Sequence, residues 1–295
     1  MSRYRLLPSP IQAAVLRDHC THARFVWNLA VEQQSWWRLG RQRPPSWVEQ
    51  CRQLSAARKE HPWLAAGSVV VQQQALRDHA QAMANYFNGT HQKPTWRKAS
   101  RDEGFRIVAV KPGHIRRLNR KVGQVYIPKA GWVRFRWSRA VPETRSFRVK
   151  LDQVGRWHVG FAAAPAPVEG PGTGQVVGVD RGVVVSAALS TGQMLTCPRL
   201  SIGRQRRLKR LQRRLARAKR GSNRRARIKH AIARLRAHEA DARKDWAEKL
   251  STDLARRFDL IRVEDLHVQE MTRSAKGTVA EPGHNVRAKA GLNRE

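Results

Sequence analysis

Two short apolar segments that end in acidic residues constrain the fold of this chain more than any other feature. The first, Val176 to Gly192, reads VVGVDRGVVVSAALSTG and carries one acid, Asp180. The second, Leu260 to Leu266, reads LIRVEDL and ends in Glu264 and Asp265. Apolar runs bounded by turn residues are typical of buried strands. Taken alone, Asp180 is best interpreted as a turn residue. Two core strands that each end in an acid, however, form the framework of a two-metal nuclease site.

The charge of the chain limits the partners it can have. Its 295 residues include 58 lysines and arginines against 22 acidic residues, a formal net charge of +36. This excess is larger than solubility requires, and a polyanion such as nucleic acid is the simplest partner. A solvated basic surface, or a protein of the ribosomal type, is the alternative. Arginine outnumbers lysine, which suits bidentate contacts with phosphate.

Residues 9–91 have the period of helices and predict a small helical domain. Ser9 and Pro10 have the residue types of an N-cap and a first helical position, and Ser46 to Glu49 matches a capping box. Ser68 is expected to start a third helix. Helical bundles need aromatic anchors, so four tryptophans are expected in the core rather than on a stacking surface: Trp36, Trp37, Trp47 and Trp63.

Alternating hydrophobicity replaces the helical period in residues 92–165, which predicts half-buried antiparallel strands. Four segments alternate in this way: 105–109, 133–137, 147–151 and 157–161. With a short strand at 4–7, residues 1–8 and 92–165 are expected to form a small antiparallel β-barrel. Arginines, including Arg134 and Arg136, fill its outward positions, and a basic barrel is a common nucleic-acid-binding architecture. Arginines that protect edge strands from aggregation are the alternative.

A segment rich in Pro and Gly follows these strands. Residues 162–174, AAAPAPVEGPGTG, have no helical or strand period, which indicates a linker. We assign the linker itself to 166–174 and a second domain to 175–295. In that domain, Val183 to Leu189 is expected to form a hairpin with Gln193 to Cys197.

The stretch from Arg204 to Arg257 has a helical period and is very basic, with a break at Gly221. Like charges recur three and four residues apart, which destabilises an isolated helix. A polyanion laid along the helices would relieve this repulsion, and a purely solvated face is the alternative. The arginines expected to contact phosphate here are Arg206, Arg210, Arg213, Arg214, Arg217 and Arg224.

The cysteines and the hydropathy pattern indicate the cellular compartment in which the protein is expected. Cys20, Cys51 and Cys197 are scattered, and their spacing predicts neither a disulfide framework nor a zinc site. No apolar run is long enough to span a bilayer, and MSRYRLLPSP lacks the apolar stretch of a signal peptide. We expect a cytoplasmic protein with no membrane partner.

The order of these pieces resembles the TnpB family, transposon-encoded relatives of type V CRISPR effectors. The resemblance runs essentially end to end, and the order and spacing of its motifs make it specific. The segments that carry it are Arg24–Asn28 (RFVWN), Gln73–Arg77, Pro128–Arg136, Gly178–Gly182 (GVDRG), Val263–Leu266 (VEDL) with Met271, and Asn285–Arg294.

The resemblance implies an RNA-guided DNA endonuclease whose partners are a guide RNA and target DNA, with the sequence chosen by base pairing. By motif, Asp180 and Glu264 would be the catalytic carboxylates that hold Mg²⁺. The ions would activate a water and stabilise the leaving 3′ oxygen. The expected fold is a multidomain α+β protein. A basic antiparallel β-barrel with a helical insertion would precede a ribonuclease-H-like (RuvC) α/β domain.

The sequence departs from the family's pattern after the second RuvC motif. The family continues into a four-cysteine zinc ribbon and a third RuvC aspartate, and neither occurs in these 295 residues. Glu270, Glu281 and Glu295 follow the motif, but not in the expected context. We therefore expect an incomplete RuvC domain with two of three acids and no zinc site, from a fragment or a truncated product. A cleavage-incompetent RNA-guided binder and a non-specific basic RNA-binding protein are the alternatives, and the sequence does not determine the oligomeric state.

Overall fold

The computed structural model of the chain describes residues 2–36, 43–101, 103–164 and 167–271, together with residues 282, 283 and 286. It is a mixed α+β structure that divides into two compact units, Met1–Pro165 and Ala166–Glu295. Each unit has its own sheet and its own hydrophobic core. No helix among these residues has the length and apolar character needed to cross a membrane.

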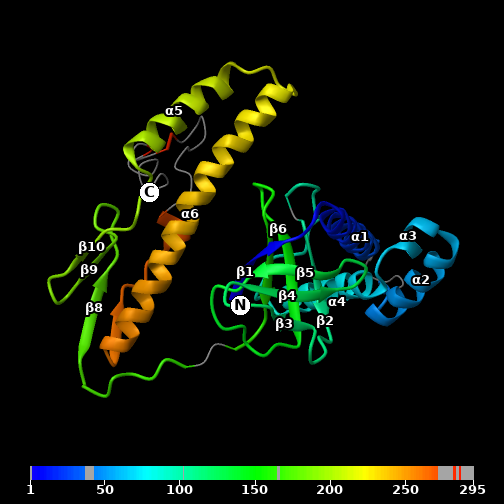
Figure 1. Cartoon of the computed structure of the whole chain (residues 1–295), viewed down its shortest axis with the longest axis horizontal. Helices are drawn as coiled ribbons and strands as arrows, with labels where there is room; N and C mark the ends of the chain where they lie inside the picture. The colour runs from blue at the N-terminus through cyan, green and yellow to red at the C-terminus, as the bar shows by residue number, and fades with distance from the viewer. Residues whose placement is uncertain are drawn as a thin grey trace. The chain divides into compact units, whose positions relative to one another are not determined.

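An antiparallel sheet of seven strands forms the frame of the first unit (Figure 1). In spatial order the strands are β2-β6-β7-β1-β5-β4-β3. Their bounds are Ser2–Leu7 for β1, Gly104–Val108 for β2, Ile115–Arg117 for β3, Val122–Ile127 for β4, Gly131–Arg136 for β5, Ser146–Leu151 for β6 and Trp157–Phe161 for β7. Strand β1 is central, because Ser2 to Arg5 pair with β7 whereas Leu6 and Leu7 pair with β5. The first strand of the chain thus joins the two halves of the sheet.

The strands predicted from alternating hydrophobicity are present, and their apolar residues face the core, except Ala109, which follows β2 and is exposed. Phe105, Phe135 and Val159 are almost inaccessible to solvent. Arg134 and Arg136 on β5 are exposed, as the alternation predicts. Strand β7 differs from the prediction because it is buried along its whole length, so both of its faces are covered.

Two strands of this sheet, β3 and β4, were not predicted. Strand β3 has only three residues, two of them arginines. Strand β4 has Gly123 at a buried position, where a Cβ atom would lie 2.7 Å from Phe135 and 2.5 Å from Trp137. A glycine in a sequence indicates a turn or a break. The strand therefore becomes recognisable only when the packing of the two aromatic rings over Gly123 is known.

The described residues of the first unit also form four helices: α1 Pro10–Ser35, α2 Trp47–Glu60, α3 Pro62–Ala66 and α4 Val69–Phe87. The start of α1 is as predicted, because the Ser9 side chain accepts from the Gln12 N–H and the Gln12 side chain accepts from the Ser9 N–H. Ser46 caps α2 by accepting from the Glu49 N–H, whereas the Ser68 side chain makes no cap bond to α4. The short α3 was not predicted, since five residues carry little periodic signal.

The helices and the sheet of this unit share one hydrophobic core. Leu16 and Leu76 from the helices belong to the same cluster of buried side chains as Phe147 from β6. Helix α1 also contacts the turn after β4 and the start of β5, because the Gln12 amide donates to the carbonyl oxygens of Ala130 and Trp132 at 3.2 and 3.0 Å. The helical segment therefore packs directly onto the sheet.

Three of the four tryptophans expected in the helical core lie at the surface. Trp36, Trp47 and Trp63 are 63%, 39% and 48% exposed, so this prediction is wrong, and Trp37 lies outside the described residues. Trp27 is the helical tryptophan that packs, at 9% exposure. The other buried residues of α1 and α4 are leucine, valine, alanine, cysteine, methionine, glutamine and histidine, so side chains smaller than tryptophan fill most of their buried faces.

The described residues of the second unit include a four-stranded sheet and a long helical hairpin (Figure 1). The sheet order is β10-β9-β8-β11, in which β8 and β11 are parallel and the other pairs are antiparallel. The elements are β8 Val176–Asp180, β9 Ala187–Leu189, β10 Met194–Leu195, α5 Ile202–Arg217, α6 Asn223–Arg257, β11 Leu260–Val263 and α7 Val268–Met271. The predicted break between α5 and α6 occurs at Gly221, whose φ of 81° suits glycine. Ser222 then caps α6 by accepting from the Arg225 N–H.

Among the described residues, one face of this sheet packs against the end of α6. Val177 and Val179 are buried in a cluster with Leu254 and Phe258 at the end of α6. On the opposite face, Val176 is 52% exposed. The expectation that β8 is a buried strand is therefore correct for one face only.

The predicted hairpin after Asp180 is shorter than expected. Its first strand begins at Ala187 rather than at Val183, so β9 has only three residues. Val184 is 81% exposed, although β-branched residues favour strands. Residues of β9 pair with β8 on one side and β10 on the other. Strand pairing, rather than propensity, therefore sets where β9 begins.

Candidate functional site

Asp180 and Glu264 lie at the ends of two adjacent strands. Strands β8 and β11 run parallel, and their last paired residues are Val179 and Val263. Asp180 is the next residue along β8, and Glu264 is the next residue after β11. The carboxyl ends of parallel strands share one edge of a sheet. The fold therefore brings the two acids predicted from the sequence to the same edge.

Both carboxylates at this edge are accessible. Asp180 and Glu264 are exposed, and the Arg181 guanidinium donates to the backbone oxygen of Glu264 at 3.3 Å. Carboxylate oxygens are ligands that Mg²⁺ prefers, and one or two of them often suffice beside waters and phosphate oxygens. Within the described residues, no three His, Cys, Asp or Glu side chains form a group that could hold a metal ion. Among the described residues, the pair would therefore need further oxygen ligands from water or substrate to hold a divalent ion.

Asp259 fixes the beginning of the same two strands. Its carboxylate accepts backbone hydrogen bonds from Gly172 at 2.8 Å and Gly174 at 2.7 Å, and one from the Thr173 hydroxyl at 3.3 Å. These bonds, chiefly that from Gly172, hold the pKa of Asp259 below its usual value because they stabilise the charged form. The end of the predicted linker is therefore attached beside the start of β11. Asp259 gave no signal in the sequence, apart from the nearby glycines.

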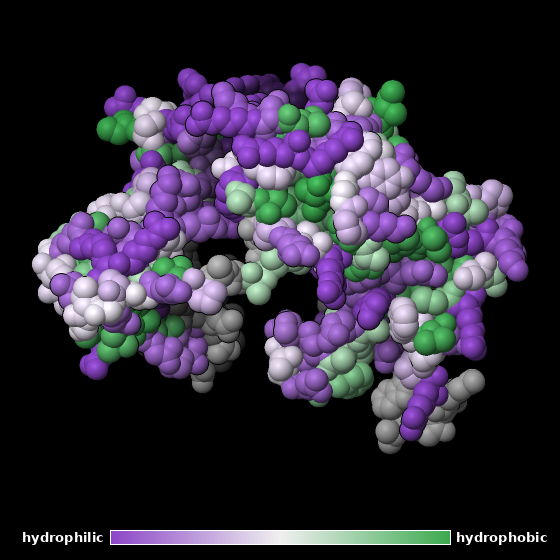
Figure 2. Space-filling view, turned by 60° about the horizontal axis from the view of Figure 1, so that its bottom comes forward, coloured by the Kyte–Doolittle hydropathy of each residue, from purple (hydrophilic) through white to green (hydrophobic). Residues whose placement is uncertain are grey.

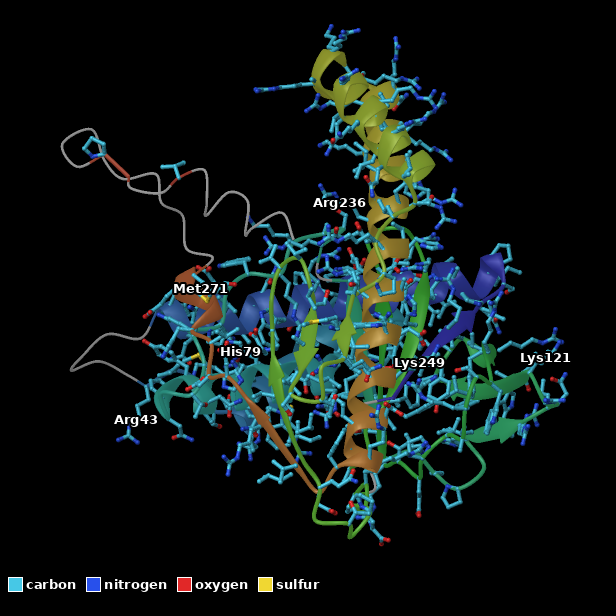
Figure 3. The ribbon with its side chains drawn as sticks, turned by 90° about the vertical axis from the view of Figure 1, so that its left-hand side faces the viewer. Arg43, His79, Lys121, Arg236, Lys249 and Met271 are labelled. Carbon is cyan, nitrogen blue, oxygen red and sulfur yellow. The ribbon has the colours of Figure 1, made fainter. Side chains whose placement is uncertain are left out.

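The six arginines predicted to contact phosphate lie on the α5–α6 hairpin and are all exposed: Arg206, Arg210, Arg213, Arg214, Arg217 and Arg224. Leu211 of α5 and Ile228 of α6 are the buried residues of this region, so the basic residues occupy the remaining faces. No Asp or Glu occurs from Arg181 to His238. Nitrogen-tipped side chains radiate from this hairpin (Figure 3), and hydrophilic residues make up most of the surface visible in Figure 2.

A basic cavity of about 480 Å³ lies between α5 and α6. Its charged and titratable lining residues are Arg204, Arg207, Arg227, His230, Arg234 and His238. None of these residues was predicted from the sequence, because the arginines predicted to contact phosphate are other residues of the same helices. Arg204 lies four residues before Leu208 of the apolar stripe, and Arg207 lies one residue before it. This spacing places both arginines beside the contact between the two helices, and it is the sequence pattern from which they could have been predicted. A cavity lined by guanidinium groups suits a phosphate oxygen.

The second half of α6 has a different charge balance. There the basic residues pair with acids one turn away: Lys244 with Glu248 at 3.6 Å, Lys249 with Asp245 at 2.6 Å and Arg257 with Asp253 at 3.1 Å. Figure 3 labels Arg236 in the half without acids and Lys249 in the paired half. The self-repulsion is therefore concentrated in α5 and the beginning of α6, where a polyanion would stabilise the helices most.

The outer face of β3, β4 and β5 combines arginines with aromatic rings. Arg134 and Arg136 are exposed on β5, and the Arg116 guanidinium lies 4.0 Å from the centre of the Trp132 ring. The Tyr126 ring is 5.7 Å from that of Trp132 and is 37% exposed. Rings beside cationic groups suit nucleic acid, because bases stack on the rings and phosphates bind the cations.

Two known families match parts of this chain. Residues 158–275 match a family described as "Probable transposase", a range that includes Asp180 and Glu264. Residues 2–42 match a family described as "Helix-turn-helix domain". The described residues 2–36 of that range form strand β1 and the long helix α1.

Two curated protein sequences are similar to nearly the whole chain. One, from Escherichia coli strain K12, is named "Putative RNA-guided DNA endonuclease InsQ" and is 31% identical over 99% of this chain and 72% of its own length. The other, from Streptomyces pristinaespiralis, is named "Putative RNA-guided DNA endonuclease" and is 32% identical over 93% of this chain and 68% of its own length. A cryo-EM structure of a Cas12f1–sgRNA–target DNA complex is similar in fold, with a TM-score of 0.52 and 12% identity. The match covers 97% of this chain and 70% of that one.

Proposed function

This chain belongs to the TnpB family of transposon-encoded proteins, and we propose that it acts as an RNA-guided DNA endonuclease. A guide RNA would select the DNA by base pairing, so the protein would recognise backbone and shape rather than sequence. Its two relatives are named for this activity. The large positive charge supports polyanionic partners, and the cytoplasm is the compartment in which we expect it to act.

The observation that carries the proposal is the pair of acids at one sheet edge. Asp180 and Glu264 directly follow Val179 and Val263, the last residues of the parallel register. In this proposal residues 175–295 are a RuvC-like nuclease domain, and the two acids are its metal-binding, catalytic carboxylates. Their exposure supports access by a DNA phosphate.

The residues at this edge fit Mg²⁺, since they offer carboxylate oxygens in an accessible position. When bound, the ion would supply an activated water and stabilisation of the leaving oxygen. Asp180 and Glu264 would hold the ion from two strands whose beginnings are fixed by Asp259. The hydrogen bond from Arg181 to the Glu264 backbone would keep the two strand ends at a constant separation.

The rest of the chain would bind nucleic acid. In this proposal residues 1–8 and 92–165 form a barrel-like domain, residues 9–91 form a helical recognition domain, and 166–174 are the linker to the nuclease domain. The exposed Arg134 and Arg136 would contact nucleic-acid backbone from the barrel. The exposed arginines of the α5–α6 hairpin would do so from the nuclease domain, where their mutual repulsion supports a bound polyanion.

A single experiment tests the proposal. The chain is expressed from its native locus, the RNA that copurifies with it is sequenced, and DNA duplexes that match or mismatch this RNA are assayed for binding and for cleavage in Mg²⁺. We expect matched DNA to bind at least about tenfold more tightly, a difference of roughly 1.4 kcal/mol, and to be cut. Matched binding without cleavage would identify an RNA-guided binder, and equal binding of all duplexes a non-specific basic protein.

A further inference from the structure

One face of α1 holds the segment Thr95–Arg101 in place. The Trp27 indole N–H donates to the Thr95 carbonyl oxygen at 2.9 Å. The Asn28 amide binds Arg97 twice, since its oxygen accepts from the Arg97 N–H at 2.8 Å and its nitrogen donates to the Arg97 carbonyl at 3.1 Å. Trp27 and Asn28 belong to the RFVWN motif, which the proposed nuclease chemistry does not use. The motif therefore holds the backbone of this segment in place through hydrogen bonds from Trp27 and Asn28.

The side chain of Arg97 is oriented by the same motif. Its guanidinium carbon lies 3.8 Å from the centre of the Trp27 ring, a geometry that favours the charged group over the ring face. Arg24, one turn before Trp27 and Asn28, forms an ion pair of 2.7 Å with Glu103 just beyond the segment. Both ends of Thr95–Arg101 are thus anchored to α1, and Arg97 is held in a defined position.

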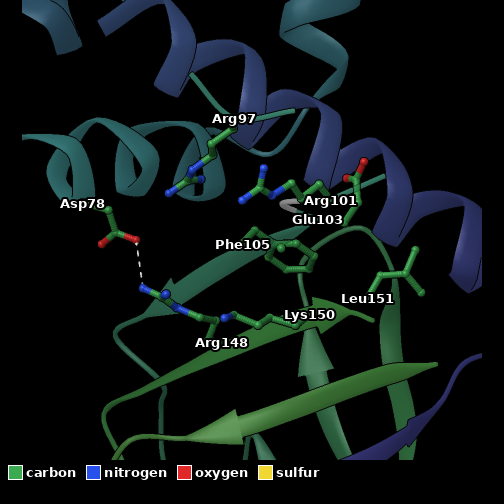
Figure 4. Close-up of a pocket in the computed structure, with 9 residues that line it drawn as sticks. Asp78, Arg97, Arg101, Glu103, Phe105, Arg148, Lys150 and Leu151 are labelled. Carbon is green, nitrogen blue, oxygen red and sulfur yellow. Dashed lines mark ion pairs between the residues drawn. The ribbon is translucent and has the colours of Figure 1, made fainter. Parts of the chain in front are cut away.

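The segment forms one wall of a pocket of about 260 Å³ (Figure 4). The opposite wall is β6, which contributes Arg148 and Lys150. In the close-up, the guanidinium groups of Arg97, Arg101 and Arg148 are directed toward the same space. Pockets for drug-sized molecules measure roughly 300–1,000 Å³ and are mostly apolar. This one is smaller and is lined mainly by charged side chains.

The charge of the pocket is positive even though it includes two acids. Asp78 is compensated by Arg148 at 3.5 Å and by Arg106 at 3.2 Å, and Glu103 by Arg24. Asp78 and Glu103 are each 15% exposed in their side chains, so solvent screens these ion pairs only partly. The lining carries four basic side chains against these two acids, which gives it a net positive charge.

We propose that this pocket binds one phosphodiester group of a nucleic-acid backbone. The inference rests on the proposed function for the identity of the ligand, whereas the site itself rests on the geometry of Arg97, Arg101, Arg148 and Lys150. Guanidinium groups donate parallel hydrogen bonds to phosphate oxygens, and a fixed Arg97 loses little side-chain entropy on binding. The RFVWN motif is then a positioning element for phosphate recognition.

The test is a titration of the full chain with two probes of arbitrary sequence, a 20-nucleotide RNA and a 20-base-pair DNA duplex, followed by fluorescence anisotropy. The double variant R101Q/K150Q removes two charges from the pocket. We expect it to bind at least one probe about tenfold more weakly near 100 mM salt. The slope of log affinity against log salt concentration is negative, and its magnitude should decrease by about one. A loss for RNA alone or for DNA alone identifies the source of the phosphate.

A matched control removes the same charges from elsewhere in the first unit. The variant R52Q/K59Q changes two exposed residues of α2 and is expected to alter affinity less than about threefold. The charge-preserving R101K/K150R should retain most of the binding, and thermal melting should be unchanged in all three variants. Equal losses in R101Q/K150Q and R52Q/K59Q, or an unchanged salt slope, would overturn the proposal. Since neither probe is matched to a guide, these outcomes are independent of whether guided recognition occurs.

Discussion

Asp180 and Glu264 follow directly on the last paired residues of two adjacent parallel strands. This relationship distinguishes Glu264 from Asp265, which lies one residue further from the paired region. Two acids follow β11 in the sequence, and the first of them, like Asp180 on β8, stands directly after the last paired residue of its strand.

If the pair holds the catalytic ion, D180N and E264Q should each lower Mg²⁺-dependent DNA cleavage by about a hundredfold or more. This corresponds to roughly 2.7 kcal/mol of transition-state stabilisation. Both variants keep the side-chain size, so guide RNA binding should stay within about twofold. The measurement is single-turnover cleavage of matched DNA. D265N is the control, and an equal loss in D265N would show that the register does not select the acid.

The hydrogen bonds to Asp259 should make the stability of the second unit depend on pH. The pKa of Asp259 is lowered in the folded state, so its contribution is present above the unfolded pKa of about 3.9 and disappears as pH falls through the folded value. D259N should therefore melt at a lower temperature than the parent chain at pH 7. The difference should shrink at about pH 3, where the parent carboxyl is increasingly protonated.

The control for Asp259 is D245N. Asp245 is an exposed acid paired with Lys249 on α6, and exposed pairs contribute little to stability. Its substitution should change the melting temperature less than D259N does at pH 7. A pH-independent effect of D259N would show that the charge of Asp259 is not what holds the segment of Gly172 and Gly174.

The salt dependence of nucleic-acid binding should be governed by the half of the hairpin that lacks acids. R206Q/R210Q/R213Q removes three exposed charges from α5 and should lower the slope of log affinity against log salt by about two to three. K244Q/K249Q/R257Q removes the same charge from the acid-paired half of α6 and should lower it by less than about one. Similar slopes for the two variants in an anisotropy titration would remove α5 from the interface.

Asn28 should matter for stability and for binding together. N28A removes both hydrogen bonds to the Arg97 backbone, a loss of about 1–3 kcal/mol. Because Arg97 would no longer be held at the pocket, affinity for at least one of the two probes should also fall, in the direction expected for R101Q/K150Q. Urea denaturation and anisotropy measure the two effects. A stability loss with unchanged affinity for both probes would limit Asn28 to a structural role.

The core of the first sheet should be sensitive to loss of an aromatic ring. Phe135 is fully buried and contacts Tyr4, Phe161 and Trp137 with ring centres 5.5–5.6 Å apart. F135A should therefore cost about 3–5 kcal/mol of unfolding free energy, measured by urea denaturation. L118A, at a residue that is 46% exposed, should cost roughly 0.5 kcal/mol or less.

Local patterns of the sequence were enough to predict many elements. The caps at Ser9 and Ser46, the alternation in β5 and β6, and the break at Gly221 depend on residues that are close in the chain. The exposure of the hairpin arginines followed from their spacing against the apolar stripe. Where local signals conflicted with packing, the predictions failed. Gly123 occupies a strand because two rings cover it. Trp36, Trp47 and Trp63 are exposed because other side chains fill the core of the first unit.

For the candidate site, the sequence by itself determined which residue types are available: two acids after apolar strands, and a long basic stretch without acids. Only the tertiary structure decided which of them meet. The parallel register of β8 and β11 brings Asp180 beside Glu264, and the hydrogen bonds of Asn28 bring Arg97 to Arg148. Both juxtapositions join residues far apart in the chain. Such contacts depend on strand pairing and close packing, which no local period of the sequence encodes.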